Sequence, residues 1–400
     1  MTATNDANRV PFLWQGEILG RWRSAAILAV ITGMNLAITA CAFAEQYGPP
    51  SPVIAGYVFS RETAFPPGQI DPHMLTRINF AFANIRNGRV VLGTPVDAQN
   101  LAAVVTLRRE NPSLSVLLSV GGWLGSASFS DVSLTAESRR VFIDSATDLI
   151  HRYDLDGLDV DWEYPGMPGS GHLFRAEDKK NFTLLMKELR ERFDKETANT
   201  GRRLFLTIAA GAFDEFLSHT EMDKVARYLD TVNLMTYDSY EAGSDAITGN
   251  HAPLYADPVD PKKSSADSTI QSFESAGVPA EKILLGVPFY GRVWGQVQDR
   301  SHGLFQPGKP VPHVEASFSL ISTTMLDQGF TRYWDAAASV PYLYNAEKHV
   351  FVSYEDPESL AGKCSYVLSH KLGGIMFWEY FSDNTGQLLK AINQSLRPRP

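Results

Sequence analysis

The chain contains very little cysteine. Only two of its 400 residues are cysteines, Cys41 and Cys364. Two cysteines are too few for a disulfide framework or for a zinc site built from cysteine ligands. We therefore expect Cys364 to lie in the hydrophobic core, where a free cysteine behaves as a small apolar side chain.

Positive charge and recognisable metal ligands are also scarce. Lys and Arg number 36 against 45 Asp and Glu, so the formal net charge is −9. An acidic chain repels phosphate backbones, and we expect no nucleic acid among its partners. The nine histidines show no HExxH or comparable spacing, so we expect no His-based metal site and no cofactor.

Apolar residues, by contrast, are plentiful. The hydrophobic fraction is 44%, which is enough for a sizeable core and excludes a disordered chain. Aromatic residues make up 11% of the chain. They fit either a large core or a binding cleft lined by rings, and composition leaves both interpretations open.

The N-terminal segment is typical of a secretory signal. No charged residue occurs from Ser24 to Ala44, and two arginines precede this run. The run ends in a small-x-small site, but it also resembles a bacterial lipobox at Cys41, and an uncleaved anchor is a third interpretation. We favour cleavage after Ala44, which makes residues 1–44 a signal peptide or lipoprotein leader. The mature chain is then expected to be extracellular or periplasmic, without membrane contact unless Cys41 is lipidated.

Beyond a short linker at residues 45–52, apolar runs alternate with amphipathic stretches. The runs are nearly continuous, as expected for parallel strands buried on both faces. Strands are expected at residues 53–59, 77–85, 114–120, 157–162, 203–210, 231–236, 283–289 and 374–378. Helices are expected at residues 98–110, 137–153, 178–196, 222–229, 265–275, 357–371 and 385–396. Eight such repeats predict an α/β fold, a closed (β/α)8 TIM barrel.

One crossover is too long for the regular alternation of strands and helices. About eighty residues separate the last two expected strands, where a single crossover needs far fewer. This stretch is rich in turns and short aromatic runs, which predicts a small α+β insertion domain at residues 293–352, in the seventh βα crossover. The catalytic barrel then comprises residues 53–292 and 353–396. An insertion on a βα loop can form a wall of the cleft at the catalytic face.

The strongest chemical signal is the run from Asp156 to Pro165, DGLDVDWEYP. Alternate residues of a strand share a face, so Asp159, Asp161 and Glu163 are expected to point into the barrel. Three close acids repel one another, and this repulsion raises at least one pKa. A carboxyl group that stays protonated near neutral pH can act as a general acid. Glu163 comes last in the row, at the mouth where barrel enzymes carry their chemistry.

Two other interpretations fit an isolated row of acids. It could be a divalent metal site, because hard cations take oxygen ligands, or a structural ladder of hydrogen bonds. The neighbouring Trp162 and Tyr164 favour a sugar over a metal ion.

At this point the sequence resembles a known family, glycoside hydrolase family 18. The DGLDVDWEYP run matches the family's DxxDxDxE signature, and the resemblance extends over residues 53–395. The further matching motifs are Ser119–Gly122, Met235–Asp238, Gly286–Arg292 and Gly373–Glu379, with looser matches at Gly56–Tyr57 and Asn79–Ala83. The stretch after Arg292 is where the deep-cleft chitinases of this family carry an α+β domain.

The resemblance implies a catalytic set. Glu163 would protonate the glycosidic oxygen, Asp161 would orient the 2-acetamido group, and Asp159 would share a proton with Asp161. Asp156 would support the turn and the network, and Tyr237 would donate a hydrogen bond to the acetamido carbonyl.

It also implies a substrate-binding set. Trp378 would form the floor of the subsite that holds the distorted sugar, and Trp123 would stack on the leaving-group side. The whole set is Asp238, Trp378, Met235, Tyr290, Arg292, Trp123, Tyr57, Gly122 and Phe80. For Tyr57, Phe80, Phe82 and Gly122, close packing at the barrel remains an alternative to substrate contact.

The same resemblance implies a secreted chitinase that hydrolyses β-1,4-linked N-acetylglucosamine polymers or oligomers. In this family the substrate's own acetamido oxygen is the nucleophile, so configuration is retained through an oxazolinium intermediate. Chitin or a chito-oligosaccharide is the expected partner of a monomeric enzyme, and no chitin-binding module is expected after the last helix. An endo-β-N-acetylglucosaminidase is the alternative. A non-catalytic lectin is disfavoured because Asp159, Asp161 and Glu163 are all present.

Overall fold

The computed structural model describes residues 51–66, 68–311 and 316–397. The expected leader at residues 1–44, its cleavage after Ala44, the lipidation at Cys41 and most of the linker lie outside the described residues. Among the helices of the described part, none is long and apolar enough to cross a membrane.

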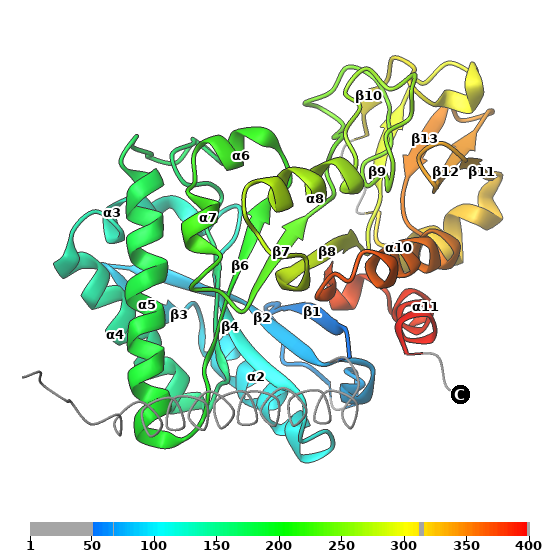
Figure 1. Cartoon of the computed structure of the whole chain (residues 1–400). Helices are drawn as coiled ribbons and strands as arrows, with labels where there is room; N and C mark the ends of the chain where they lie inside the picture. Colours follow the sequence, from blue (N-terminus) through cyan, green and yellow to red (C-terminus); the bar gives the residue numbers. More distant parts are fainter. Residues whose placement is uncertain (1–50, 67, 312–315, 398–400) are drawn as a thin grey trace, which may run out of the picture. The chain divides into compact units, whose positions relative to one another are not determined.

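Eight parallel strands form a closed barrel (Figure 1). They follow one another in the order β1-β14-β8-β7-β6-β5-β4-β2, and β1 also pairs with β2, which closes the ring. The fold class predicted from the alternating pattern, a (β/α)8 barrel, is confirmed. The barrel strands are β1 (Val53–Phe59), β2 (Arg77–Arg86), β4 (Ser115–Gly121), β5 (Gly157–Asp161), β6 (Phe205–Gly211), β7 (Thr231–Met235), β8 (Ile283–Pro288) and β14 (Gly374–Trp378).

One strand beside the barrel was not expected. β3 (Arg89–Leu92) pairs antiparallel with the end of β2. The turn between them is Asn87-Gly88, and both residues have positive φ, 51° and 76°. Asn-Gly is the strongest short signal for a two-residue hairpin, so this strand could have been predicted from the sequence.

The helices cover the outside of the barrel. Side-chain caps set their starts: the hydroxyl of Thr94 accepts from the backbone N–H of Asp97, and Asp356 caps the helix that begins at Pro357. The expected helix at residues 222–229 is shorter, because after Val225 the chain continues in i→i+3 turns. The helices are α2 (Pro95–Thr106), α3 (Phe129–Val132), α4 (Ala136–Tyr153), α5 (Asp178–Thr200), α6 (Asp214–Ser218), α7 (Met222–Val225), α8 (Ala266–Ser275), α9 (Phe318–Leu320), α10 (Pro357–Ser369) and α11 (Gln387–Leu396).

A second, five-stranded antiparallel sheet lies between β8 and α10 in the chain (Figure 1). Its core is aromatic, with Trp294 and Phe351 fully buried. Tyr240, from the loop after β7, packs into the same core. The strands, in the order β10-β9-β13-β12-β11, are β9 (Arg292–Gly295), β10 (Lys309–Pro310), β11 (Thr331–Asp335), β12 (Val340–Asn345) and β13 (Val350–Ser353).

Strand β5 divides its side chains between two environments. Leu158, Val160 and Trp162 pack outward, and the Trp162 ring stacks on Phe129 at 5.3 Å between centroids. Asp159 and Asp161 point into the barrel and are 0% and 4% exposed. The alternation predicted from the sequence therefore holds, and it places two carboxyl groups where water is excluded.

Cys364 lies where the sequence predicts, in the core. It belongs to α10 and is fully buried. Burial raises the pKa of its thiol to about 12, so the thiol is protonated at neutral pH.

Candidate active site

The loop after β4 holds the carboxyl end of β5. The N–H of Gly122 donates to the carbonyl of Asp161 at 2.8 Å, and the N–H of Glu163 donates to the Ser126 hydroxyl at 2.9 Å. Gly121 has φ of +112°, and a Cβ there would lie 2.1 Å from the Asp161 carbonyl oxygen. A side chain at this position would push the two strands apart, so the glycine is required for the close approach. Ser126 was not singled out from the sequence, because no motif marks it.

Asp159 is the most fully hydrogen-bonded acid of the row. Its carboxylate accepts from the hydroxyls of Tyr57 and Ser119, both at 2.8 Å, from the hydroxyl of Thr207, and from the Nδ2 of Asn233 at 3.0 Å. Burial raises the pKa of Asp159, and these donors act against that rise. Four donors on two oxygens favour the ionised form.

The surroundings of Asp161 and Glu163 favour the protonated form instead. The Oδ1 of Asp161 is buried and has no hydrogen-bond partner among the described residues. Burial, with the charges of Glu163 and Asp159, raises the pKa of Asp161 well above its usual value. Burial also raises the pKa of Glu163 to about 7, and the charge of Asp238 contributes to that rise. Glu163 therefore holds its proton in the range where a general acid is useful, and the pKa of the neighbouring Asp161 is shifted in the same direction.

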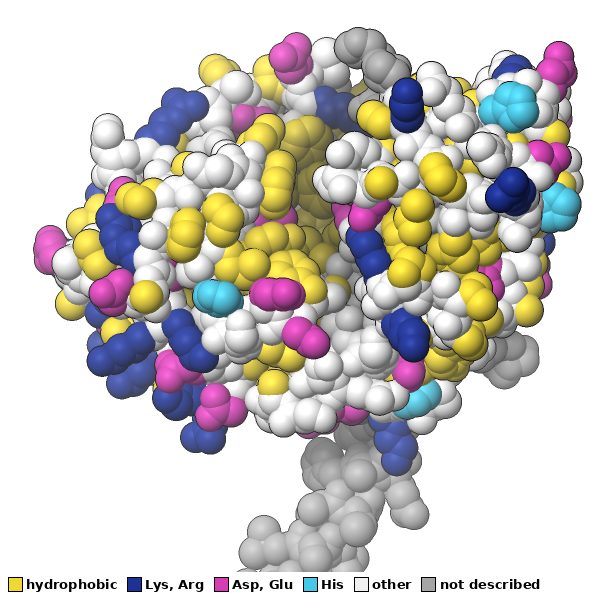
Figure 2. Space-filling model, turned by 90° about the horizontal axis from the view of Figure 1, so that it is seen from above, with side chains coloured by type: hydrophobic (Ala, Val, Ile, Leu, Met, Phe, Trp, Pro, Cys, Tyr) yellow, Lys and Arg dark blue, Asp and Glu magenta, His cyan; other side chains and the backbone are white. Residues whose placement is uncertain are grey.

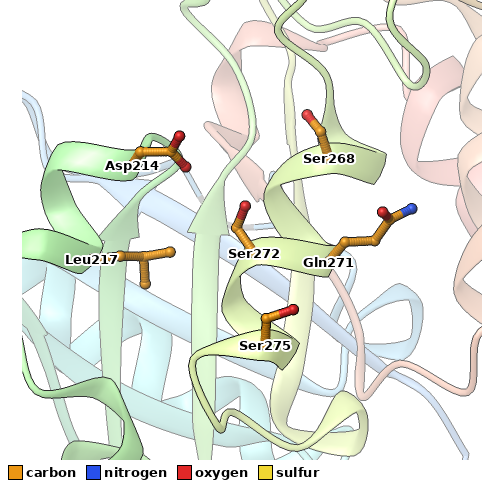
Figure 3. A pocket seen from close by; sticks show the side chains of 6 residues that line it. All are labelled: Asp214, Leu217, Ser268, Gln271, Ser272 and Ser275. Carbon is orange, nitrogen blue, oxygen red and sulfur yellow. The ribbon is translucent and has the colours of Figure 1, made fainter.

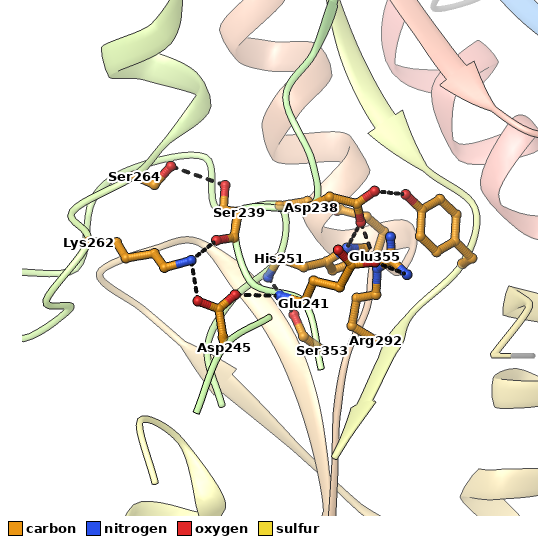
Figure 4. A network of polar contacts seen from close by, with 12 residues as sticks. Asp238, Ser239, Glu241, Asp245, His251, Lys262, Ser264, Arg292, Ser353 and Glu355 are labelled. Atoms are coloured by element: carbon orange, nitrogen blue, oxygen red, sulfur yellow. Dashed lines mark hydrogen bonds and ion pairs between the residues drawn. The ribbon is translucent and has the colours of Figure 1, made fainter. Parts of the chain in front are cut away.

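Asp238 lies at the rim, directly after β7, in a network of donors (Figure 4). Its carboxylate accepts from the Nε of Arg292 and from the hydroxyl of Tyr290, both at 2.7 Å, and lies 3.5 Å from the Nδ1 of His251. Burial alone would raise the pKa of Asp238, but His251 and Arg292 outweigh it and lower the pKa. Glu241 forms a further ion pair with Arg292 at 3.1 Å.

Aromatic rings surround the row. The half-buried Trp378, at the end of β14, stacks on Phe82 at 5.4 Å and lies 5.7 Å from Tyr57. Met235 and Tyr237, at and after the end of β7, belong to the same apolar cluster inside the barrel. From above, the side toward which β6 and β7 point, the surface is hollowed by a groove lined with hydrophobic side chains, with acidic ones among them (Figure 2).

Trp123 lies at the edge of the site and is 48% exposed. Its ring meets Tyr164 edge-on at 6.4 Å, and its carbonyl oxygen lies 2.8 Å from the Nε2 of His172. An exposed indole held by its backbone offers a flat face to a ligand at little entropic cost.

Phe80 does not belong to the site. It is fully buried in the core between barrel and helices, because strand alternation turns Asn79 inward and Phe80 outward. The register with β4 shifts between Phe80 and Ala83. Within this irregularity Phe82, for which the sequence leaves barrel packing and substrate contact open, packs against Trp378 and Gly122.

Asp156 does not belong to the site either. It precedes β5, five residues before Asp161, which is roughly 16 Å along an extended strand. Its carboxylate accepts from the N–H of Val116 at 2.7 Å and pairs with Arg202 and Arg108. Asp156 therefore fastens the amino ends of β4 and β5, which is a supporting role of the kind that the resemblance implies, and its place among the catalytic residues is corrected.

Neither a second pocket nor a cluster of metal ligands offers another site in the described residues. A pocket between α6 and α8 is lined by short polar side chains and one leucine and has no aromatic ring (Figure 3). Its lining residues are Asp214, Leu217, Ser268, Gln271, Ser272 and Ser275. Within residues 51–66, 68–311 and 316–397, no three His, Cys, Asp or Glu side chains are grouped as a metal site.

Comparison with known proteins decides the family. The model of the family "Glycosyl hydrolases family 18" matches residues 53–383. The chain belongs to glycosyl hydrolase family 18. The family predicted from the motifs, and with it the enzyme class of a glycoside hydrolase, is confirmed.

Three known proteins show how far the likeness extends. Chitinase A1 of Niallia circulans is 37% identical over 388 residues; the match covers 82% of this chain and 55% of that protein's length. A family 18 N-acetylglucosaminidase from Paenibacillus barengoltzii is 41% identical with a TM-score of 0.79, covering 86% of this chain and 99% of that one. A mutant Class V chitinase from Nicotiana tobaccum in complex with NAG4 is 29% identical with a TM-score of 0.78, again covering 86% and 99%.

Proposed function

We propose that this family 18 chain is a chitinase that hydrolyses β-1,4-linked N-acetylglucosamine chains with retention of configuration. The observation that carries the proposal is the pair Asp161 and Glu163, whose raised pKa values hold a proton at the carboxyl end of β5. Chitinase A1 of Niallia circulans and the NAG4 complex of the Nicotiana tobaccum enzyme support the choice of substrate.

In the first step Glu163 gives its proton to the glycosidic oxygen, and the bond from C1 to that oxygen breaks. The carbonyl oxygen of the substrate's acetamido group attacks C1, which forms the oxazolinium ion. Asp161 orients the acetamido N–H and balances the positive charge, and the Tyr237 hydroxyl donates to the acetamido oxygen. The nucleophile is tethered to the substrate, so no second carboxylate has to attack.

In the second step water attacks C1 from the side the leaving group has vacated. Glu163, now ionised, accepts the proton of that water, which returns the acid to its starting form. Two inversions at C1 give net retention. Trp378 supports the face of the distorted sugar, and Asp238 with Arg292 and Tyr290 hydrogen-bonds its hydroxyl groups.

A second candidate is the release of single N-acetylglucosamine units. The relative from Paenibacillus barengoltzii is described as an N-acetylglucosaminidase, and 99% of its chain is matched. Both candidates share the chemistry at C1 and differ in how many sugars the groove accommodates. An endo-β-N-acetylglucosaminidase acting on N-linked glycans is a further variant of the same chemistry.

The test is a product profile of the purified protein on a long chito-oligosaccharide, with the anomeric form of the new reducing end followed by NMR. Dimers and longer products with the β-anomer formed first support the chitinase. Monomer released one at a time supports the second candidate, and activity on N-linked glycans alone supports the glycan-acting variant. Cleavage of a substrate without N-acetyl groups at the same rate would contradict the substrate-assisted mechanism.

We also propose that the protein is secreted, because the uncharged run from Ser24 to Ala44 follows a basic flank. N-terminal sequencing of the protein from its native host distinguishes a chain that starts after Ala44 from one that starts at a lipidated Cys41.

A further inference from the structure

Arg77 is a buried cation in the interior of the barrel. It is the first residue of β2 and is 4% exposed. Its guanidinium donates to the Thr231 hydroxyl and to the Oδ1 of Asn233, both at 2.9 Å. These partners belong to β7, whereas β2 is flanked in the sheet by β1, β3 and β4. The Arg77 side chain therefore crosses the interior from one wall to the other.

Asn233 connects Arg77 to the row of acids. Its Oδ1 accepts from Arg77, and its Nδ2 donates to the Oδ1 of Asp159 at 3.0 Å and to the Tyr57 hydroxyl at 3.1 Å. A guanidinium only donates and a carboxylate only accepts, so the amide can take no other orientation between them. One side-chain amide thus separates the cation from Asp159.

The charge of Arg77 has no carboxylate in direct contact within the described part of the chain. A buried guanidinium without a counter-charge is costly, so the nearest anions decide its environment. The acids facing Arg77 are Asp159 and Asp230, with the Tyr57 hydroxyl between the strands. Asp230 already pairs with Arg190 and Arg203. Asp159 receives only neutral donors, and Asp161 is the acid next to it.

We propose that Arg77 is a positioning residue for the reaction: its buried positive charge, transmitted through Asn233, keeps Asp159 ionised. An ionised Asp159 keeps the proton on the pair formed by Asp161 and Glu163, because the negative charge of Asp159 raises the pKa of Asp161. With the proton on Asp159 instead, Asp161 would ionise and Glu163 would lose its proton-sharing neighbour. The inference deepens the proposed function and rests on it for its kinetic consequences.

The kinetic test compares three variants across the acid and neutral range. Arg77→Gln keeps an amide donor but removes the charge, Arg77→Lys keeps the charge, and Arg109→Gln makes the same charge change at the exposed surface. For Arg77→Gln we expect the acid limb of kcat/KM to move up by about one pH unit and kcat at the acid side to fall about tenfold, with KM unchanged. Arg77→Lys should restore the wild-type limb, and Arg109→Gln should not move it.

An acid limb of Arg77→Gln that coincides with that of the wild type overturns the proposal. The proposal is also overturned if kcat falls equally in Arg77→Gln and Arg77→Lys while the acid limb stays in place. Such a result would mean that the Arg77 side chain acts through packing and not through its charge.

A second measurement needs neither activity nor a stable variant of Arg77. Isotope-edited infrared spectra of the wild type carry a carboxylate band of Asp159, which is assigned by its loss in Asp159→Asn. We expect that band to persist in mildly acidic buffer, whereas a protonated Asp159 there overturns the proposal even if every Arg77 variant fails to fold. A wild type with an ionised Asp159 but without activity on chito-oligosaccharides refutes the proposed function and leaves the role of Arg77 standing. If the wild type is active on chito-oligosaccharides and the acid limb of Arg77→Gln is unmoved, the proposed function stands and the role of Arg77 is refuted.

Discussion

The two acidic regions of the site have opposite electrostatics. Inside the barrel, Asp161 and Glu163 lie among apolar walls and like charges, and their pKa values are raised. At the rim, the side chain of Asp238 is 33% exposed, and Arg292, Tyr290 and His251 surround its carboxylate, whose pKa is lowered. Loss of contact with water acts to raise the pKa in both regions, so desolvation alone does not decide which acid keeps its proton. The partners decide, and one site thereby holds an acid and an anion side by side.

The largest effect is expected where the inner region loses its acid. Glu163→Gln keeps the shape and cannot give up a proton, so kcat on chito-oligosaccharides should fall by about 10²- to 10⁴-fold with KM little changed. Steady-state kinetics measure this, with the surface variant Glu110→Gln as the matched control. Equal activity of Glu163→Gln and wild type would remove Glu163 from the inner region's chemistry.

The ion pair behind the outer region tests how firmly that region is held. Lys363 on α10 and Glu355 are both fully buried; Lys363 donates to Glu355 and, at 2.6 Å, to the carbonyl of Ala252, the residue after His251. Lys363→Met leaves a buried carboxylate without its cation, so the free energy of unfolding should fall by about 3–5 kcal/mol. Urea denaturation measures the loss, with the exposed Lys390→Met as control.

The two lysine variants distinguish the loss of a buried ion pair from the loss of an exposed lysine. A loss for Lys363→Met no larger than that for Lys390→Met would show that the loop carrying His251 is held by other contacts.

Removing the negative charge of Asp238 at the rim should change the pKa of Glu163 in the inner region, which tests whether the two regions interact. In the wild type, activity that needs protonated Glu163 should decline as the pH rises through about 7. The negative charge of Asp238 raises the pKa of Glu163, so in Asp238→Asn that pKa is lower and the alkaline limb moves to lower pH. The loss of charged hydrogen bonds should also reduce kcat/KM by about 10- to 100-fold. A pH–rate profile beside that of Asp223→Asn, an exposed control, measures both effects, and an alkaline limb that stays in place would show that the regions act independently.

The sequence predicted the inner region better than the outer one. Asp159, Asp161 and Glu163 are adjacent in one strand, and a period of two is enough to place them on one face. Arg77 and Asn233 lie 156 positions apart and meet only because the barrel closes. His251 and Asp238 are brought together by the loop after β7, which no local pattern describes.

The errors have the same physical origin. Phe80 was assigned to the site although the alternation of side chains along β2 turns it outward. The shift of register in β2, which brings Phe82 to Trp378, cannot be predicted from the amino-acid composition. Asp156 matches the first aspartate of the DxxDxDxE signature, but it precedes the strand and its charge is already paired with two arginines. A motif therefore identifies the acids, whereas the length of the strand decides which of them reach the substrate.

The smallest effect is expected at the edge, where neither electrostatic environment extends. Trp123 is half exposed and contacts Tyr164 only edge-on. A sugar stacked on such a ring is expected to contribute as much as an aromatic pair does, about 0.5–1.5 kcal/mol, so Trp123→Ala should raise KM for a long chito-oligosaccharide by about 2- to 10-fold while kcat changes little. Leu124→Ala, at a neighbouring side chain that is 81% exposed, is the matched control for the loss of apolar surface. A fall in kcat comparable to that of Glu163→Gln would mean that the indole aligns the scissile bond, and the edge would then belong to the inner region.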